Sequence, residues 1–239
     1  MEYVVQLANS IKVETEIDRR DQALIAFLLL SGMRDSAAAS LPLGCFDRGK
    51  LTINHDPSEG VKTKFGKAYL TCLFRFDDQL LDYVTTWAEY LEKDKLFSST
   101  DPLFPRTRVT QAPGSLSFCA DAVGPFFWKG AGSIREILKS RAKAAGLEYY
   151  HPHTFRHATA HLAIRGCNSP EEMKAISQNL GHEQVMTTLM TYGNLDSHRV
   201  EELIGMLDFS PESRDRAAVL EEMERVFLKA KKTLTKRFP

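Results

Sequence analysis

Two arginines, two histidines and a tyrosine in this chain have side chains suited to binding a phosphodiester and attacking it. They are Arg34 in Ser-Gly-Met-Arg, His153 and Arg156 in His-Thr-Phe-Arg, His182 in Leu-Gly-His, and Tyr192. Guanidinium groups bind phosphate oxygens through paired hydrogen bonds. Histidine exchanges protons near neutral pH, and a deprotonated phenol is a nucleophile. The set therefore predicts metal-independent breakage and rejoining of DNA strands.

In their order along the chain, these residues resemble the catalytic domain of the tyrosine recombinases, the phage-integrase family. The resemblance runs from about Asp18 through Tyr192, and its most specific part is the block HTFRHATAHL…LGHEQVMTTLMTY. A lone HxxR occurs often by chance, whereas the ordered series Arg, Lys, HxxR, LGH, Tyr is much more specific. The resemblance implies a mainly α-helical catalytic domain with a small antiparallel β-sheet (α+β), of the DNA breaking-rejoining fold.

The resemblance also implies a role for each residue that would bind the phosphate. Arg34 and Arg156 would hold its oxygens in the ground state and in the pentacoordinate transition state. His153 would help to accept the proton of the attacking tyrosine, and His182 would contact the scissile phosphate. Any one of them alone would more often be a surface arginine or a structural histidine.

The nucleophile and the leaving-group acid follow from the same resemblance. Tyr192 would attack the phosphorus and form a 3′-phosphotyrosine link, which stores the broken bond, so no nucleotide cofactor is expected. Lys64 is our choice for the lysine that protonates the leaving 5′-oxygen. Lys62 and Lys67, in the same turn, remain rival candidates.

One departure from the family pattern concerns the support of the first arginine. Three residues after that arginine the family usually has an acid, and here the position holds Ala37. Support for Arg34 must therefore come from elsewhere or be weaker. His157 and His161, four residues apart, could suggest a metal pair. Because no third ligand is indicated, we interpret them as packing or surface groups and expect no metal.

The overall charge counts mildly against nucleic-acid binding. The chain of 239 residues has 31 basic and 31 acidic side chains and a pI near 7.1, whereas DNA-binding domains usually show a basic excess. Local clusters can still supply the charge. The lysines and arginine concerned are Lys62, Lys64 and Lys67 in one segment, and Lys229, Lys231, Lys232, Lys236 and Arg237 in the tail.

The composition is that of a globular intracellular protein. The longest apolar run, Ala23 to Leu30, is too short to cross a bilayer, and the N-terminus lacks a secretory pattern. We therefore expect a cytoplasmic, DNA-associated protein with no membrane contact. The cysteines are far apart and indicate neither a zinc site nor a disulfide framework: Cys45, Cys72, Cys119 and Cys167.

Apolar periodicity and turn residues predict mostly helices. We expect helices over 18–31, 77–93, 133–146, 154–166 and 170–180, strands over 51–53 and 68–74, and an irregular connection over 101–114. Asp18 would cap the first of these helices and Gly32 would end it, Ser133-Ile134-Arg135-Glu136 has the form of a capping box, and Ser169 would cap the last. The apolar residues of the 77–93 helix recur at helical spacing: Leu80, Leu81, Val84, Trp87, Ala88 and Leu91. Further helices would start at Asp196 and Ser210. The chain would then comprise a linker-like segment (1–17), a catalytic domain (18–209) and a C-terminal helical tail (210–239) that can pack on a neighbouring protomer.

Three functions fit these residues. The first is a site-specific recombinase or integrase, in which pairs of protomers within a homo-tetramer cleave two sites on double-stranded DNA. The second is a type IB topoisomerase, which has the same catalytic groups and would relax supercoils as a monomer. The third is a non-catalytic DNA-binding module that lacks the N-terminal clamp domain usual in the family. We favour the recombinase because of the LGH block and the helical tail.

Overall fold

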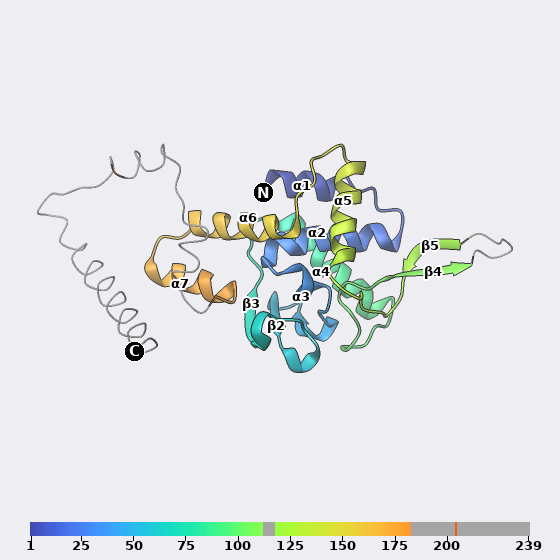
Figure 1. Ribbon diagram of the computed structural model, residues 1–239, viewed down its shortest axis with the longest axis horizontal. Helices are drawn as coiled ribbons and strands as arrows, with labels where there is room; N and C mark the ends of the chain where they lie inside the picture. Colours follow the sequence, from blue (N-terminus) through green and yellow to red (C-terminus); the bar gives the residue numbers. More distant parts are fainter. Residues whose placement is uncertain (112–117, 183–203, 205–239) are drawn as a thin grey trace, which may run out of the picture. The chain divides into compact units, whose positions relative to one another are not determined.

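The computed structural model describes residues 1–111, 118–182 and 204. Its elements combine helices with two small antiparallel sheets, one more than the single sheet predicted (Figure 1). The helices are α1 (Glu2–Asn9), α2 (Glu16–Ser31), α3 (Asp35–Ala38), α4 (Asp78–Lys93), α5 (Gly132–Ala144), α6 (Pro152–Arg165) and α7 (Pro170–Asn179). The strands are β1 (Phe46–Asp47), β2 (Thr52–His55) and β3 (Tyr69–Cys72) in one sheet, and β4 (Thr107–Gln111) and β5 (Phe118–Val123) in the other.

Helix α2 is the core of the fold. Residues 20–31 are all buried, and α1, α4 and α6 pack against this helix, which explains why its sequence is apolar on every side. The helix begins with a capping box, in which the Thr15 hydroxyl accepts from the Asp18 amide and the Asp18 carboxylate accepts from the Thr15 amide. Thr15, rather than Asp18, is therefore the N-cap. The predicted end is confirmed, because Gly32 follows with a φ of 59°.

Residues 1–17 contain a packed helix. Val4, Leu7 and Ala8 of α1 are buried, and the Gln22 side chain donates a hydrogen bond of 2.9 Å to the carbonyl of Ala8. The linker-like interpretation is therefore wrong for residues 2–9. The apolar spacing of positions 4, 7 and 8 places all three on the face that meets α2.

Helix α4 confirms the periodicity prediction. Asp77 caps it by accepting from the Leu80 amide, and the predicted apolar stripe is buried: Leu80, Leu81, Val84, Trp87, Ala88 and Leu91. The 101–114 connection, by contrast, was wrongly expected to be irregular. Part of it forms strand β4, which pairs antiparallel with β5 in a hairpin that extends away from the helices (Figure 1). The β-branched residues of Thr107–Gln111 favour a strand, although they lack apolar alternation.

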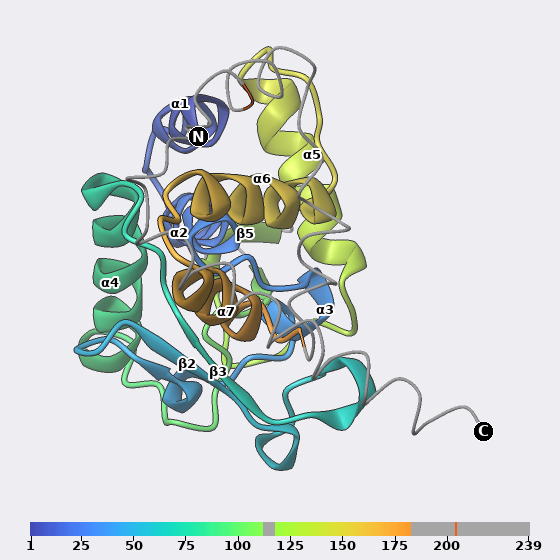
Figure 2. The same ribbon diagram turned by 90° about the vertical axis from the view of Figure 1, so that its left-hand side faces the viewer.

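The second half of the described chain is helical, as expected, but one cap differs. Helix α5 begins after Ala131 without a side-chain cap, so the predicted capping box at Ser133 is absent there. Helix α6 ends at Gly166, and Ser169 caps α7 by accepting from the Glu172 amide, as predicted. In the turned view, α6 lies over α2, and α7 lies below α6, beside β3 (Figure 2).

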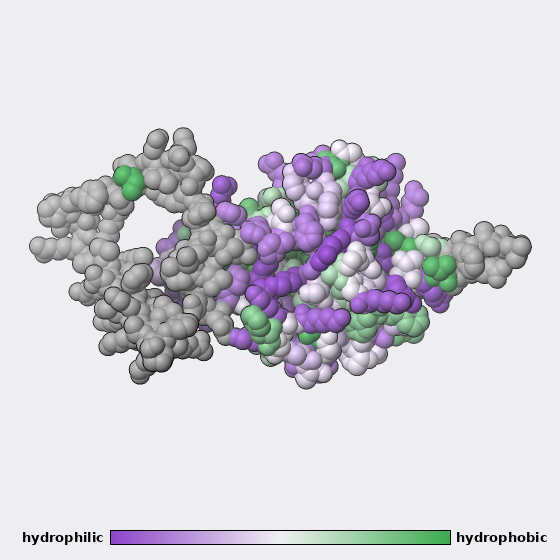
Figure 3. Space-filling model, in the orientation of Figure 1, coloured by the Kyte–Doolittle hydropathy of each residue, from purple (hydrophilic) through white to green (hydrophobic). Residues whose placement is uncertain are grey.

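By its internal contacts the chain divides into residues 1–192 and 193–239, and all the elements above belong to the first unit. The expected tail (210–239) and the helix starts at Asp196 and Ser210 lie outside the described residues. The face drawn in Figure 3 is mostly hydrophilic. None of the helices in the described part combines the length and apolar composition needed to span a membrane.

Candidate functional site

The end of α2 places Arg34 where three segments meet. A Cβ atom added at Gly32 would lie 2.9 Å from Cδ2 of Leu180 and 3.1 Å from Cγ2 of Thr159. Gly32 is thus required both for its left-handed conformation and for the close approach of α6 and the end of α7. Two residues later, Arg34 precedes α3 as its N-cap residue, half-buried at the surface.

Arg156 joins the three sequence motifs. Its side chain is buried, and its Nη1 atom donates to the Gly32 carbonyl at 2.7 Å, while Nη2 donates to the Leu180 carbonyl at 2.6 Å. Nη2 also lies 3.0 Å from Nε2 of His182. A buried charge requires such polar partners. One guanidinium group therefore connects SGMR, HxxR and LGH.

His182 is held as a neutral imidazole. Burial lowers its pKa to about 4, with further contributions from the positive charges of Arg156, Arg34 and Lys64. Because arginine can only donate, Nε2 of His182 must accept from Arg156, which leaves the proton of the neutral ring on Nδ1. The ring is placed by Gly181, whose φ is 69°, and by a hydrogen bond from the His182 amide to the Ser177 carbonyl.

His153 lies in the first turn of α6, exposed to solvent. Its pKa is lowered by partial burial and by the charges of Arg156, Arg34 and His151, while Asp35 opposes the shift. A neutral His153 can accept a proton at neutral pH. Its ring meets the His157 ring edge to face at 4.6 Å. Among the described residues, no three His, Cys, Asp or Glu side chains are grouped so that they could hold a metal ion.

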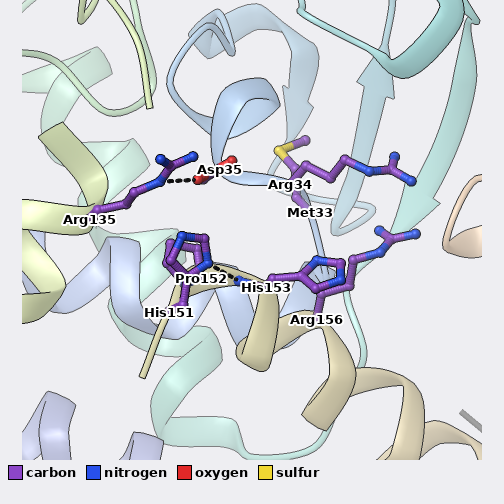
Figure 4. Close-up of a pocket in the computed structure, with 8 residues that line it drawn as sticks. All are labelled: Met33, Arg34, Asp35, Arg135, His151, Pro152, His153 and Arg156. Carbon is purple, nitrogen blue, oxygen red and sulfur yellow. Dashed lines mark hydrogen bonds and ion pairs between the residues drawn. The ribbon is translucent and has the colours of Figure 1, made fainter. Parts of the chain in front are cut away.

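A cavity of about 180 Å³ lies beside these groups, with Arg34, His153 and Arg156 in its wall. In the close-up, the guanidinium groups of Arg34 and Arg156 extend to the same side of the His153 ring (Figure 4). On the other side, Asp35 forms an ion pair of 2.9 Å with Arg135 of α5. This cavity therefore lies between α3, α5 and α6, and its wall holds Arg34 and Arg156 together with the imidazoles of His151 and His153.

Position 37 gives Arg34 no polar support, as its alanine implies. Ala37 is buried and apolar, and the Arg34 side chain makes no hydrogen bond to another residue in the part of the chain that the structure describes. The neighbouring acid, Asp35, is paired with Arg135 instead. Among the described residues, the Arg34 guanidinium group thus keeps its donors available for a ligand.

Lys64 lies in the loop between β2 and β3, in a short 3-10 helix that spans Lys64–Gly66. It is exposed, its Nζ atom lies 4.9 Å from the Phe65 ring centroid, and its charge contributes to the lowered pKa of His182. The structure therefore brings Lys64 within electrostatic reach of the histidine. Tyr192 lies outside the described residues.

Two site residues were not foreseen from the sequence. His55 ends β2, and burial lowers its pKa to about 3, with contributions from Arg156 and Arg34. Burial raises the pKa of Tyr69, the first residue of β3, and the same two arginines oppose that shift. The signal that could have indicated them is their place on the buried face of two paired strands. Both arginines thus act on four rings, those of His55, Tyr69, His153 and His182.

Comparison with known proteins identifies the family of this chain. The sequence model of the phage integrase family matches residues 2–199. The chain belongs to the phage integrase family. Tyrosine recombinase XerC of Corynebacterium efficiens is 26% identical over 199 residues, which cover 82% of this chain and 54% of XerC. This family member therefore spans about half the length of that curated relative.

Solved recombinase structures share the fold. The XerA recombinase superposes with a TM-score of 0.60 and 18% identity, covering 87% of this chain and 62% of XerA. The XerH site-specific recombinase, in a post-cleavage complex with its palindromic difH substrate, superposes with a TM-score of 0.55 and 20% identity. The match covers 86% of this chain and 51% of XerH. The predicted recombinase catalytic-domain fold is confirmed.

Proposed function

We propose that this phage integrase family member is a site-specific recombinase or integrase that cleaves and rejoins double-stranded DNA through a 3′-phosphotyrosine intermediate. The observation that carries the proposal is the contact set of Arg156. It holds Gly32, Leu180 and His182 together, with Arg34 two residues from the first of these. This arrangement directs two cations and two neutral imidazoles at one anion-sized region.

The chemistry of cleavage divides among these groups. Arg34 and Arg156 neutralise the phosphate and the extra charge of the pentacoordinate transition state. Neutral His153 takes the phenolic proton of Tyr192, and the phenolate oxygen attacks phosphorus. The bond between phosphorus and the 5′-oxygen breaks, and Lys64 gives that oxygen a proton. The reverse reaction needs only a 5′-hydroxyl, so neither a metal nor a nucleotide cofactor takes part.

The proposed partner is double-stranded DNA, bound by pairs of protomers within a homo-tetramer. The XerH structures are complexes with difH DNA before and after cleavage, which supports a DNA substrate for a chain of the same fold. Relatedness to XerC favours recombination over supercoil relaxation. In the described residues, the positive charge of the site comes from Arg34, Arg156 and Lys64, so the zero net charge of the chain is no obstacle to local phosphate binding.

Nicked suicide duplexes test the proposal, since the fragment after the cleaved bond diffuses away and traps the covalent complex. The duplexes would carry the DNA that flanks the reading frame. We expect a denaturation-resistant protein–DNA adduct with the wild type and none with Tyr192→Phe. A wild type that binds this DNA yet forms no adduct, even when a clamp domain is supplied, would establish the non-catalytic binding module instead.

Paired sites then separate recombinase from topoisomerase. A recombinase converts two paired duplexes into Holliday junctions, which migrate slowly on a native gel. A type IB topoisomerase relaxes a supercoiled plasmid without forming junctions. We expect junctions from wild-type protein, and relaxation without junctions would overturn the recombinase assignment while leaving the covalent chemistry intact.

A further inference from the structure

The loop that carries Lys64 is closed at its base by two stacked aromatic rings. His55 is the last residue of β2, Tyr69 is the first residue of β3, and the two are direct partners in the antiparallel register. Their rings stack with centroids 3.9 Å apart and an interplanar angle of 14°. Residues 56–68, with Lys64 among them, therefore begin and end on this pair.

The same stack rests on the segment that carries His182. A Cβ atom added at Gly181 would lie 2.8 Å from Cε2 and Cζ of Tyr69. The Tyr69 ring therefore covers the backbone immediately before His182, at a position where a side chain would leave no room. Gly181 itself adopts a φ of 69°, so the ring contact and the backbone conformation both require glycine there.

Three hydrogen bonds fix the rest of this contact. The Asn179 side chain pairs with the backbone of Cys72, accepting from its amide at 2.6 Å and donating to its carbonyl at 2.9 Å. The Thr71 hydroxyl donates to the Asn179 carbonyl at 2.8 Å. The end of α7 is thus attached to β3 through Asn179, next to the contact between Tyr69 and Gly181.

The His55 ring in this stack is buried without hydrogen-bond partners among the described residues. The side chain is fully buried, and neither ring nitrogen has a hydrogen-bond partner in the described part of the chain. Buried polar atoms without partners destabilise a fold. The ring is neutral at physiological pH, so it stacks on Tyr69 without adding charge beside the two arginines.

We propose that the His55–Tyr69 stack is a positioning element that holds the Lys64 loop against Leu180-Gly181-His182. The leaving-group acid and the phosphate-binding histidine then face the same phosphodiester. The inference rests on the proposed recombinase function and assigns residues that act through Lys64 and His182 rather than on the DNA. Loss of the Tyr69 ring shifts the Lys64 loop, and a displacement on the order of 1 Å lowers a rate by up to about 100-fold.

A DNA substrate with a different leaving group distinguishes a positioning role from a general loss of stability. In a suicide duplex with sulfur in place of the bridging 5′-oxygen, the thiolate leaves without being protonated, because a thiol pKa is only about 8.5. On ordinary DNA we expect Tyr69→Leu to form adduct about 10- to 100-fold more slowly than wild type. On the sulfur duplex the deficit should shrink to within a few-fold, as it should for Lys64→Ala.

Conservative and distant variants complete the test. Tyr69→Phe and His55→Phe keep the stacked rings and should restore adduct formation to within about threefold of wild type. Tyr83→Leu removes a partly buried tyrosine of α4 that contacts Asn9, and should leave the ratio of rates on the two duplexes unchanged. If Tyr69→Leu lacks a cooperative thermal transition, His55→Leu removes the other ring of the stack and takes its place.

The outcomes separate this inference from the proposed function. Wild-type protein without adduct on either duplex would refute both. Active wild type together with a Tyr69→Leu variant of normal rate, or with an equal deficit on the two duplexes, would overturn the positioning role and leave the recombinase function standing. A deficit on ordinary DNA that the sulfur duplex relieves would support it.

Discussion

The Nη2 atom of Arg156 lies 3.0 Å from Nε2 of His182, and the same Nη2 donates to the carbonyl of Leu180. The two residues are 26 positions apart in the sequence, yet they form one partly buried polar unit next to the end of α2. Because the guanidinium group also satisfies two main-chain carbonyls, Arg156 contributes to the fold as well as to the proposed chemistry.

Alanine at the two arginines should therefore have different effects. Arg156→Ala leaves the carbonyls of Gly32 and Leu180 without their donors, and we expect it to lower the free energy of unfolding by roughly 3 kcal/mol and to abolish adduct formation. Arg34→Ala should lower adduct formation about 100- to 1000-fold with a change in stability below about 1 kcal/mol. Denaturant titration and suicide-duplex trapping measure the two quantities.

Arg156→Lys is the matched control for charge, because it keeps the cation and loses the fork. We expect it to remain far less active than wild type. Both alanine variants should retain much of their DNA affinity, since one phosphate contact among many is lost. Equal stability losses in Arg34→Ala and Arg156→Ala would contradict the structural role given to Arg156.

Lysine substitutions in the β2–β3 loop identify the leaving-group acid. Lys64→Ala should slow adduct formation on ordinary DNA by about 100-fold or more, and much less on the sulfur-bridged duplex. Lys62→Ala and Lys67→Ala, in the same loop, are the matched controls and should retain most activity on both. A larger deficit for Lys62→Ala or Lys67→Ala would move the acid to that residue.

His55→Phe should change how stability depends on pH. The folded-state pKa of His55 is about 3 and the unfolded value is about 6.5, so above pH 6.5 both states are neutral and this residue adds no pH dependence. As the pH falls below 6.5, the unfolded chain binds a proton that the folded chain excludes, and wild-type stability decreases by roughly 1.4 kcal/mol per pH unit.

The His55→Phe variant has no imidazole, so it lacks both the protonation of the unfolded chain at this position and the two unpartnered ring nitrogens. Its unfolding free energy should be about 1–2 kcal/mol higher than that of wild type at pH 7.5, and the difference should grow toward pH 4.5. Urea unfolding at several pH values measures both. A constant or shrinking difference would show that His55 titrates normally in the folded state.

Gly181→Ala tests the contact between Tyr69 and the Leu-Gly-His segment. The alanine would have to adopt a left-handed backbone conformation, and its Cβ would lie 2.8 Å from the Tyr69 ring. Backbone strain and displacement of the ring therefore both destabilise the variant. Gly60→Ala is the matched control, because its φ is 89° and nothing lies within 4 Å of the added Cβ.

We expect a loss of about 1–2 kcal/mol for Gly60→Ala, from backbone strain alone. Gly181→Ala should lose clearly more and should also slow adduct formation at least about tenfold. Thermal denaturation and trapping measure the pair. Similar stability and activity in the two variants would indicate that the Tyr69 ring moves aside without consequence.

The sequence predicted best those elements whose signals are local. Helix α4 has six apolar residues at helical spacing beneath an Asp77 cap, and all six are buried. The end of α2 at Gly32 and the cap of α7 at Ser169 depend on single residues with strong local preferences. By contrast, strand β4 is formed through its pairing with β5. Its own sequence lacks the apolar alternation that would predict a strand.

The candidate site shows the same difference between residues with local sequence signals and residues whose role depends on long-range contacts. Motif resemblance named Arg34, His153, Arg156 and His182, and the structure places them around one region, whereas Tyr192 stays a sequence prediction. His55 and Tyr69 were missed because their significance arises from cross-strand register and from the glycine beneath them. Such long-range contacts are set by tertiary packing, so a single sequence does not reveal them.

The site of covalent attachment tests the central claim most directly. Adduct trapped on a suicide duplex would be digested with protease and nuclease, and mass spectrometry would locate the nucleotide-bearing residue. We predict a 3′-phosphate linked to Tyr192, one of seven tyrosines in the chain. A link at Tyr69 or at any residue other than Tyr192, or a 5′-phosphate link, would contradict the account.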